Sequence, residues 1–199
     1  MKIDEKVVTE NFEIFRKLCE SISDDRKDPI LRIVDHFGER LALCPASSRE
    51  KYHASFPGGL IDHSLRVYKN ARILAKSFNM NVDPTSLLIS ALFHDFGKVG
   101  DLDADLYLPE TSEWHREKLG QNYKVNEEIQ KMPNAERGLW IMQHFGVKLT
   151  LDEWIAIRCN DGPYAEENKY YSMSEPNLAL VIHMADRLAC QAEKDRTVK

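Results

Sequence analysis

Apolar side chains recur every three to four residues along most of the chain, and this spacing is typical of amphipathic helices. Asp83 followed by Pro84 adds a helix cap and a proline at the first helical position. We expect helices over residues 5–19, 30–37, 60–78, 84–93, 135–145 and 152–159, and a last helix that starts at Ser174 and Pro176. The pattern therefore predicts an all-α protein.

Turn signals separate these helices. Pro45, Pro57 and Gly58-Gly59 predict a loop over 42–59, and Asn160-Asp161-Gly162-Pro163 predicts a sharp turn. Leu106, Tyr107 and Leu108 favour a short strand, so we allow for a β-hairpin near 100–110. We see no internal repeat and no linker. We interpret residues 1–199 as one compact helical domain, with N-terminal helices over 5–44 and a core over about 57–190.

Composition excludes several classes of protein. The 199 residues suit one domain, and no apolar run approaches the ~20 residues of a membrane helix. The polar start, Lys2 to Lys6, is unlike a secretory signal, and the four cysteines form no C-x-x-C pair. We therefore expect a cytoplasmic protein without a disulfide framework. A net charge of −5 without a basic block argues against long duplex nucleic acid as a partner, but leaves a small phosphorylated substrate open.

Three places put metal-ligating residue types where core residues are expected. His63 lies at the edge of an apolar stripe, His94-Asp95 ends the most apolar helix, and Asp186 borders the buried face of the last helix. A single histidine on a helix is more often a hydrogen-bonded core residue than a ligand. An unpaired carboxylate in such apolar surroundings is costly, however, so a cation should compensate Asp95 and Asp186. Two imidazoles and two carboxylates suit Zn²⁺, Mn²⁺, Fe²⁺ or Co²⁺.

These residues stand in the strings PGGLIDHSLRV, LLISALFHDFGKVG and VIHMADRLA. The chain thereby resembles the HD superfamily of metal-dependent phosphohydrolases, whose signature is H…HD…D. The resemblance implies a divalent metal ion (Mn, Co, Zn, Fe or Mg) held by His63, His94, Asp95 and Asp186. It also implies that Asp95 orients the attacking water.

The string CPASSREKYHASFPGGLIDHSL is most similar to the branch with bacterial 3′-to-5′ exoribonucleases, where P-A-x-x-x-x-H-H-A-x-x-G-G-L-x-x-H precedes the first ligand. Tyr52 replaces the first histidine of that pair, and His53 keeps the second. Asn160-Asp161-Gly162 replaces an H-H-G turn, so the chain departs from the pattern that best supports two metals. We also expect no accessory nucleic-acid-binding domain.

The resemblance therefore implies hydrolysis of a small nucleotide, most of all a deoxynucleoside mono- or triphosphate. Compact 5′-deoxynucleotidases and phage enzymes that remove dATP are the similar proteins, and many HD enzymes are homo-oligomers. The alternatives are a 3′-to-5′ exonuclease, a cyclic-nucleotide phosphodiesterase, and a nucleotide-sensing module without turnover.

Further residues are candidates for substrate contacts. Lys98 is a candidate phosphate ligand, although a lysine after a helix end also favours the helix dipole. Arg66 belongs to an H-S-x-R string like that of deoxynucleotide-cleaving HD enzymes, although it could instead pair with Asp62. His115, in a polar segment that could cover the site, and His144 are candidates for acid catalysis or phosphate contact, or are surface histidines. The remaining candidates are Asp161 for the substrate, His183 for orienting Asp186, and Trp114, Tyr107, Tyr123 and Tyr164 for base stacking.

Overall fold

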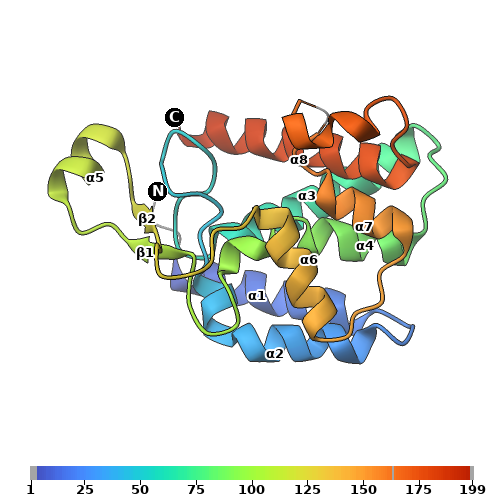
Figure 1. The fold of residues 1–199 in the computed structure, drawn as a ribbon, viewed down its shortest axis with the longest axis horizontal. Coiled ribbons are helices and arrows are strands. Elements are labelled where there is room, and N and C mark those ends of the chain that lie inside the picture. The colour runs from blue at the N-terminus through green and yellow to red at the C-terminus, as the bar shows by residue number, and fades with distance from the viewer. Residues whose placement is uncertain (1–3, 163, 198–199) are drawn as a thin grey trace.

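Helix α4 (Pro84–Phe93) is the centre of the fold because it is apolar on every side. Asp83 caps it by accepting a hydrogen bond from the Ser86 backbone, and Ser86 through Phe93 are all buried. In the computed structural model, which describes residues 4–162 and 164–197 with side chains to residue 194, α4 packs against α1, α3, α7 and α8 (Figure 1). The metal-ligating candidates at its end are therefore surrounded by other helices.

The other elements surround this helix. In chain order they are α1 (Glu5–Glu20), α2 (Lys27–Leu43), α3 (Gly59–Ser77), η1 (Phe96–Val99), β1 (Tyr107–Pro109), α5 (Glu113–Leu119), β2 (Tyr123–Val125), α6 (Asn134–His144), α7 (Leu151–Arg158), η2 (Glu166–Tyr171) and α8 (Asn177–Thr197). Helices α1 and α2 lie on one side of α4, and α8 lies on the other, against α3 (Figure 1). The all-α prediction is confirmed.

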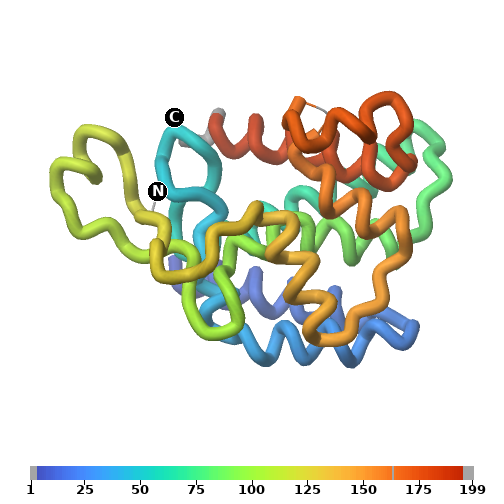
Figure 2. Tube along the Cα trace, in the orientation of Figure 1, coloured from blue at the N-terminus to red at the C-terminus, as the bar shows by residue number. Residues whose placement is uncertain are grey.

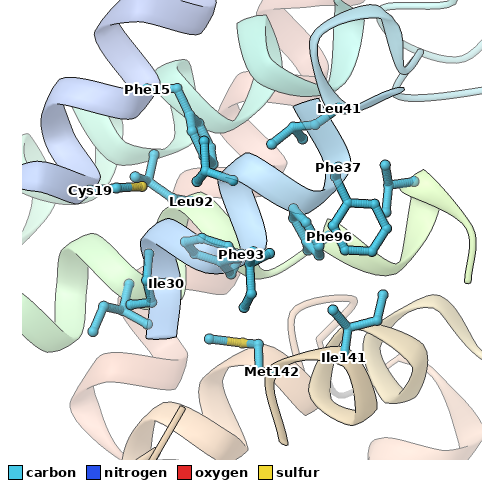
Figure 3. Close-up of a cluster of buried hydrophobic side chains, with 14 of the residues drawn as sticks. Phe15, Cys19, Ile30, Phe37, Leu41, Leu92, Phe93, Phe96, Ile141 and Met142 are labelled. Carbon is cyan, nitrogen blue, oxygen red and sulfur yellow. The ribbon is translucent and has the colours of Figure 1, made fainter. Parts of the chain in front are cut away.

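A phenylalanine-rich core joins the N-terminal helices to α4. The ring centroids of Phe15 and Phe93 are 5.7 Å apart, and those of Phe37 and Phe96 are 5.2 Å apart (Figure 3). Met142, on α6, lies in the same cluster. Burial of this surface fixes the end of α4 and the turn after it, because Phe93 and Phe96 flank His94 and Asp95 in sequence.

Two segments differ from the sequence-based expectations. Helix α2 extends beyond the expected 30–37, because the chain continues helically to Leu43 after a kink at Gly38, where φ is +41°. The strand near Leu108 exists, but its antiparallel partner is β2, with Tyr107 opposite Val125. It does not form a hairpin within 100–110, since α5 lies between the two strands.

The segment from β1 through α5 to β2 extends from the helical body as an arm (Figure 2). The arm is joined to the loop before α3 by backbone hydrogen bonds, including one from Glu50 N–H to the Gly120 carbonyl. Within the described ranges, no helix is both long and apolar enough to cross a membrane.

Candidate metal centre

Two glycines position His63 at the start of α3. Gly58 has a φ of +82°, which side chains rarely adopt, and a Cβ on Gly59 would lie 2.1 Å from the Ala54 carbonyl oxygen. The Pro-Gly-Gly sequence therefore lets the preceding loop fold tightly against the first turn of the helix. His63 follows one turn later and is fully buried.

His94 and Asp95 lie where α4 ends and η1 begins. A Cβ on Gly97 would lie 2.0 Å from the Asn134 carbonyl oxygen, so the glycine allows η1 to pack directly against α6. The side chains of His94 and Asp95 are buried at this junction. The H-D-x-G-K string is thus a helix end followed by a tightly packed turn.

The four residues of the H…HD…D pattern converge on one point. Nε2 of His63 is 3.0 Å from Oδ1 of Asp186, 3.2 Å from Nε2 of His94 and 3.7 Å from Oδ2 of Asp95. Nε2 of His94 is 3.6 Å from Oδ2 of Asp95 and 3.9 Å from Oδ1 of Asp186. Ligands of one tetrahedral zinc ion at ~2.0–2.1 Å are about 3.3 Å from one another, close to these separations.

The outer partners of the two histidines orient their lone pairs toward this point. Nδ1 of His94 is 2.9 Å from the carbonyl oxygen of Ala91, which can only accept, so Nδ1 carries the hydrogen. Nδ1 of His63 is 3.2 Å from both carboxylate oxygens of Glu193. Once His63 has given up its second proton, two imidazole lone pairs and two carboxylates face each other, and this donor set fits a divalent cation.

The charge balance also favours a cation. Burial alone would lower the pKa of His63, but its hydrogen bonds to Asp186 and Glu193 outweigh that effect and raise the pKa to about 10. Burial would raise the pKa of Asp95 and Asp186; the surrounding positive groups, Lys98 foremost for Asp95 and His63 for Asp186, hold both pKa values below the usual range. In the metal-free protein, a proton on His63 supplies positive charge beside these carboxylates. A divalent cation can take the place of that proton.

A family model describes the same region. The HD domain model matches residues 60–190, well over half of the chain, and that range includes all four converging residues. The chain belongs to the HD-domain family. The sequence-based identification is thus confirmed, and membership implies a metal-dependent hydrolase. Comparisons with curated proteins and with solved structures found no significant match.

A polar cavity of about 650 Å³, called the HD cavity below, opens beside the four converging residues. Asp95, Lys98 and Asp186 form part of its wall, together with Asp161 from the turn after α7. Nζ of Lys98 is 2.5 Å from Oδ2 of Asp95, and both side chains are largely buried. Lys98 thus belongs to the cavity wall and pairs with one of the candidate metal ligands. The cationic side chains Arg158, Arg187 and Lys194 complete the basic part of the lining.

The structure shows Arg66 in the alternative pairing with Asp62 rather than at the cavity. Its guanidinium makes two 2.9 Å hydrogen bonds to the carboxylate of Asp62, and its Nε lies 3.7 Å from Oε1 of Glu193. It is not among the described residues that line the cavity. Arg66 therefore adjoins the carboxylate behind His63 rather than the space for a phosphate.

His115 and His144 also lie away from the HD cavity. His115 is on α5, in the arm, where its Nδ1 is 3.2 Å from Oε2 of Glu110. His144 is exposed at the end of α6, beside the ring of Trp140. Neither belongs to the described lining of the cavity. His183 lies 3.0 Å from the carbonyl oxygen of Asn160, so in this structure it holds the turn after α7.

Of the aromatic candidates, Tyr107 lines the HD cavity. Tyr123 lies in the neighbouring strand, and its ring centroid is 6.4 Å from that of Tyr107. Trp114 on the arm and Tyr164 after α7 are exposed. Tyr107 is therefore the aromatic side chain from this set that is placed to contact a ligand in the cavity.

Four residues near the centre were not assigned a role from sequence. Glu193 holds His63, and Asn160 donates hydrogen bonds to the His94 carbonyl and, at 3.4 Å, to Oδ1 of Asp95. The amide oxygen of Asn160 is buried without a partner among the described residues. His53 and Cys190 lie on the cavity wall beside Asp186. Glu193 lies two helical turns after Asp186, and that spacing is the signal that could have identified it.

Proposed function

We propose that this protein is a divalent-metal-dependent phosphohydrolase that cleaves a phosphate ester or anhydride of a small nucleotide. The preferred substrate class is a deoxynucleoside mono- or triphosphate, with dATP among the candidates. The observation that carries the proposal is the convergence of His63, His94, Asp95 and Asp186 beside a cavity whose wall includes cationic side chains. Hydrolysis of a phosphate needs both features, a cation site and groups that neutralise negative charge.

The ligand chemistry assigns distinct tasks to the residues. His63, His94, Asp95 and Asp186 would hold the ion. When bound, a divalent cation would act as a Lewis acid. It would lower the pKa of a bound water molecule so that hydroxide is available at neutral pH, and it would withdraw charge from a phosphoryl oxygen. The other oxygen of Asp95, Oδ1, accepts a 3.4 Å hydrogen bond from the side-chain amide of Asn160, which helps to hold the carboxylate in place.

The cavity supports a small substrate. Its volume of about 650 Å³ lies in the range of small-molecule sites, ~300–1,000 Å³. Lys98 and Arg187 would neutralise charge on the phosphate, and Tyr107 offers a face for a base. Asp161 and Glu167 in the same wall would repel a long polyanion, which favours a mononucleotide over an oligonucleotide.

A turnover screen tests the proposal. Ribo- and deoxynucleoside mono-, di- and triphosphates, a cyclic nucleotide and a short single-stranded oligonucleotide are each incubated with Mn²⁺, Co²⁺, Mg²⁺ or Zn²⁺, and the products are separated by ion exchange. We expect metal-dependent release of phosphate, pyrophosphate or triphosphate from a free deoxynucleotide. Chelator and Asp95→Asn should abolish it, whereas Asp103→Asn, in an exposed loop, should not.

Other outcomes identify the alternatives. Faster cleavage of the oligonucleotide or the cyclic nucleotide would move the protein to the exonuclease or phosphodiesterase class. Nucleotide binding without turnover under every metal would identify a sensing module.

A further inference from the structure

A second cavity, called the arm pocket below, shares part of its wall with the HD cavity. It has a volume of about 410 Å³ and lies between the β1–β2 ribbon of the arm, the end of α2 and the loop before α3. Lys98 and Tyr107 line both cavities. On the loop, Pro45 lines the arm pocket and the next residue, Ala46, lines the HD cavity. The two cavities are therefore direct neighbours.

The wall of the arm pocket is mostly aromatic and apolar. Tyr107 on β1 and Tyr123 on β2 lie on one face of the ribbon, because Pro109, two residues after Tyr107, is the register partner of Tyr123. Their ring centroids are 6.4 Å apart, with the ring planes at 52°. A pocket walled in this way suits a flat, uncharged group. The other apolar residues in the wall are Leu43, Pro45, Pro57 and Val99.

The two tyrosine hydroxyls give this wall its capacity for specific hydrogen bonds. Neither hydroxyl makes a hydrogen bond to another residue that the structure describes. Burial raises the pKa of Tyr107 and of Tyr123, so each hydroxyl keeps its hydrogen at neutral pH. A phenol both donates and accepts hydrogen bonds. The pair can therefore meet the carbonyl, amino and ring-nitrogen groups at the edge of a heteroaromatic base.

The charged groups of the arm pocket disfavour a phosphate. Nε of Arg40 is 2.7 Å from Oδ1 of Asp105, and its two terminal nitrogens donate to carbonyl oxygens of residues 101–102 at 3.0 and 2.9 Å. The ammonium of Lys98 is bonded to the HD carboxylate, which lines the HD cavity. The carboxylates of Glu39 and Asp105 add negative charge to the wall. The arm pocket therefore suits the uncharged part of a nucleotide, and the HD cavity suits the phosphate.

We propose that the arm pocket binds the base of the nucleotide whose phosphate lies in the HD cavity, with Tyr107 and Tyr123 against the base and Lys98 at the junction of the two cavities. The inference rests on the proposed function, because it assigns the other end of the same substrate. Leu43 and Tyr123 line the arm pocket but not the described wall of the HD cavity. They therefore determine which base is accepted without contributing to metal binding.

Filling the arm pocket tests this assignment. Leu43 is 45% exposed at the end of α2, so Leu43→Trp adds bulk at the pocket without disturbing the core. We expect KM for the best deoxynucleotide to rise about tenfold or more, with a smaller change in kcat and an unchanged affinity for Mn²⁺. Turnover of 2-deoxyribose that carries the same number of phosphates but no base should stay within about twofold of the wild-type value. Ile73→Trp, at an exposed position on α3, is the matched control.

Nucleoside binding gives a second measurement that needs no turnover. Deoxyadenosine, deoxyguanosine, thymidine and deoxycytidine are each added to the chelator-treated protein, and binding is followed by saturation-transfer NMR. We expect at least one of them to bind, to compete with the nucleotide, and to lose binding in Leu43→Trp but not in Ile73→Trp. Tyr123→Phe, which removes one hydroxyl, should reduce the preference among the four bases.

The outcomes separate this inference from the proposed function. Nucleotide turnover with an unchanged KM in Leu43→Trp overturns the base assignment and leaves the proposed function standing. A nucleoside that inhibits turnover without competing with the nucleotide does the same, because it identifies a separate regulatory ligand. Nucleoside binding that Leu43→Trp abolishes supports the arm pocket even where no nucleotide is hydrolysed with any metal, and the proposed function then fails alone. Circular dichroism of each variant confirms that it is folded.

Discussion

The carboxylate of Glu193 lies 3.2 Å from Nδ1 of His63, although the two residues are 130 positions apart. Both side chains are buried, and the contact joins α8 to α3 directly behind the metal-facing nitrogen. A carboxylate at this position fixes which nitrogen carries the hydrogen and increases the basicity of the other. Glu193 is therefore a positioning residue for the centre rather than a ligand.

Replacement of Glu193 should weaken metal binding more than it weakens the fold. Glu193→Leu removes the acceptor for Nδ1 of His63, so we expect the metal affinity to fall about 10- to 100-fold. Glu193→Gln keeps an acceptor oxygen and should lose less. Calorimetric titration with Mn²⁺ measures both, and Glu13→Gln on the exposed face of α1 is the control. Equal affinities for Glu193→Leu and the wild-type protein would show that Glu193 does not act through His63.

Metal binding should be coupled to proton release. The pKa of His63 is raised to about 10, so below that pH the imidazole is protonated and the incoming cation must displace the proton. Because the protonated state is favoured as the pH falls, the apparent metal affinity should drop by roughly tenfold per pH unit between about pH 6 and 8. Calorimetry in two buffers with different ionisation enthalpies should detect about one proton released per ion.

His144 provides the matched control for this measurement. It is an exposed histidine on α6, so His144→Gln should leave the proton release unchanged. Metal affinity that is independent of pH over this range would contradict protonation of His63 in the free protein.

Much of this centre follows from the sequence because its signals are local. The helix that carries His94 is determined by a cap at Asp83 and a continuous apolar run, and the turn after it by Gly97. The same holds for His63, which follows two glycines. Such patterns need no knowledge of distant contacts, and they predicted the longer helices and the family, but not the short helices α5 and η2.

The residues that line no substrate cavity have different reasons for their positions, one local and the others long-range. Arg66 and Asp62 lie one helical turn apart, and the structure realises that local pairing instead of a phosphate contact. His115 was expected near the site because the segment around it is polar, but the pairing of β1 with β2 carries it away on an arm. The contact of Cys190 Sγ with Nδ1 of His53, at 3.5 Å, likewise depends on where a loop folds against α8.

Lys98 should stabilise the protein mainly by compensating Asp95. Its Nζ is 2.5 Å from Oδ2 of Asp95 in a buried setting, so Lys98→Met removes the nearest cationic partner of a buried carboxylate. We expect a loss of about 3–5 kcal/mol in the free energy of unfolding when metal is chelated. Saturating Mn²⁺ should recover part of the loss, because the cation takes over the compensation. Urea unfolding with chelator and with Mn²⁺ measures both values.

A purely helix-terminal role for Lys98 predicts a different result. Lys76, in the exposed last turn of α3, reports what a lysine at a helix end contributes here. Lys76→Met should cost only about 0.3–1 kcal/mol, with or without Mn²⁺. If Lys98→Met matches that small, metal-independent loss, compensation of Asp95 is not its role.

Arg187 should bind the substrate phosphate through a local contact. It follows Asp186 on α8, it is exposed, and it lines the HD cavity, so its guanidinium can meet an anion without rearrangement of the core. Arg187→Ala should raise KM for the best deoxynucleotide with little change in kcat or stability, because the interaction is made already in the bound ground state. Arg72→Ala, which replaces an exposed arginine on α3, is the control.

Because few cations contact the substrate, the logarithm of kcat/KM should fall only shallowly with the logarithm of salt concentration, and more shallowly still in Arg187→Ala. A steep salt dependence, or an unchanged KM in Arg187→Ala, would place the phosphate elsewhere and favour a longer nucleic-acid substrate.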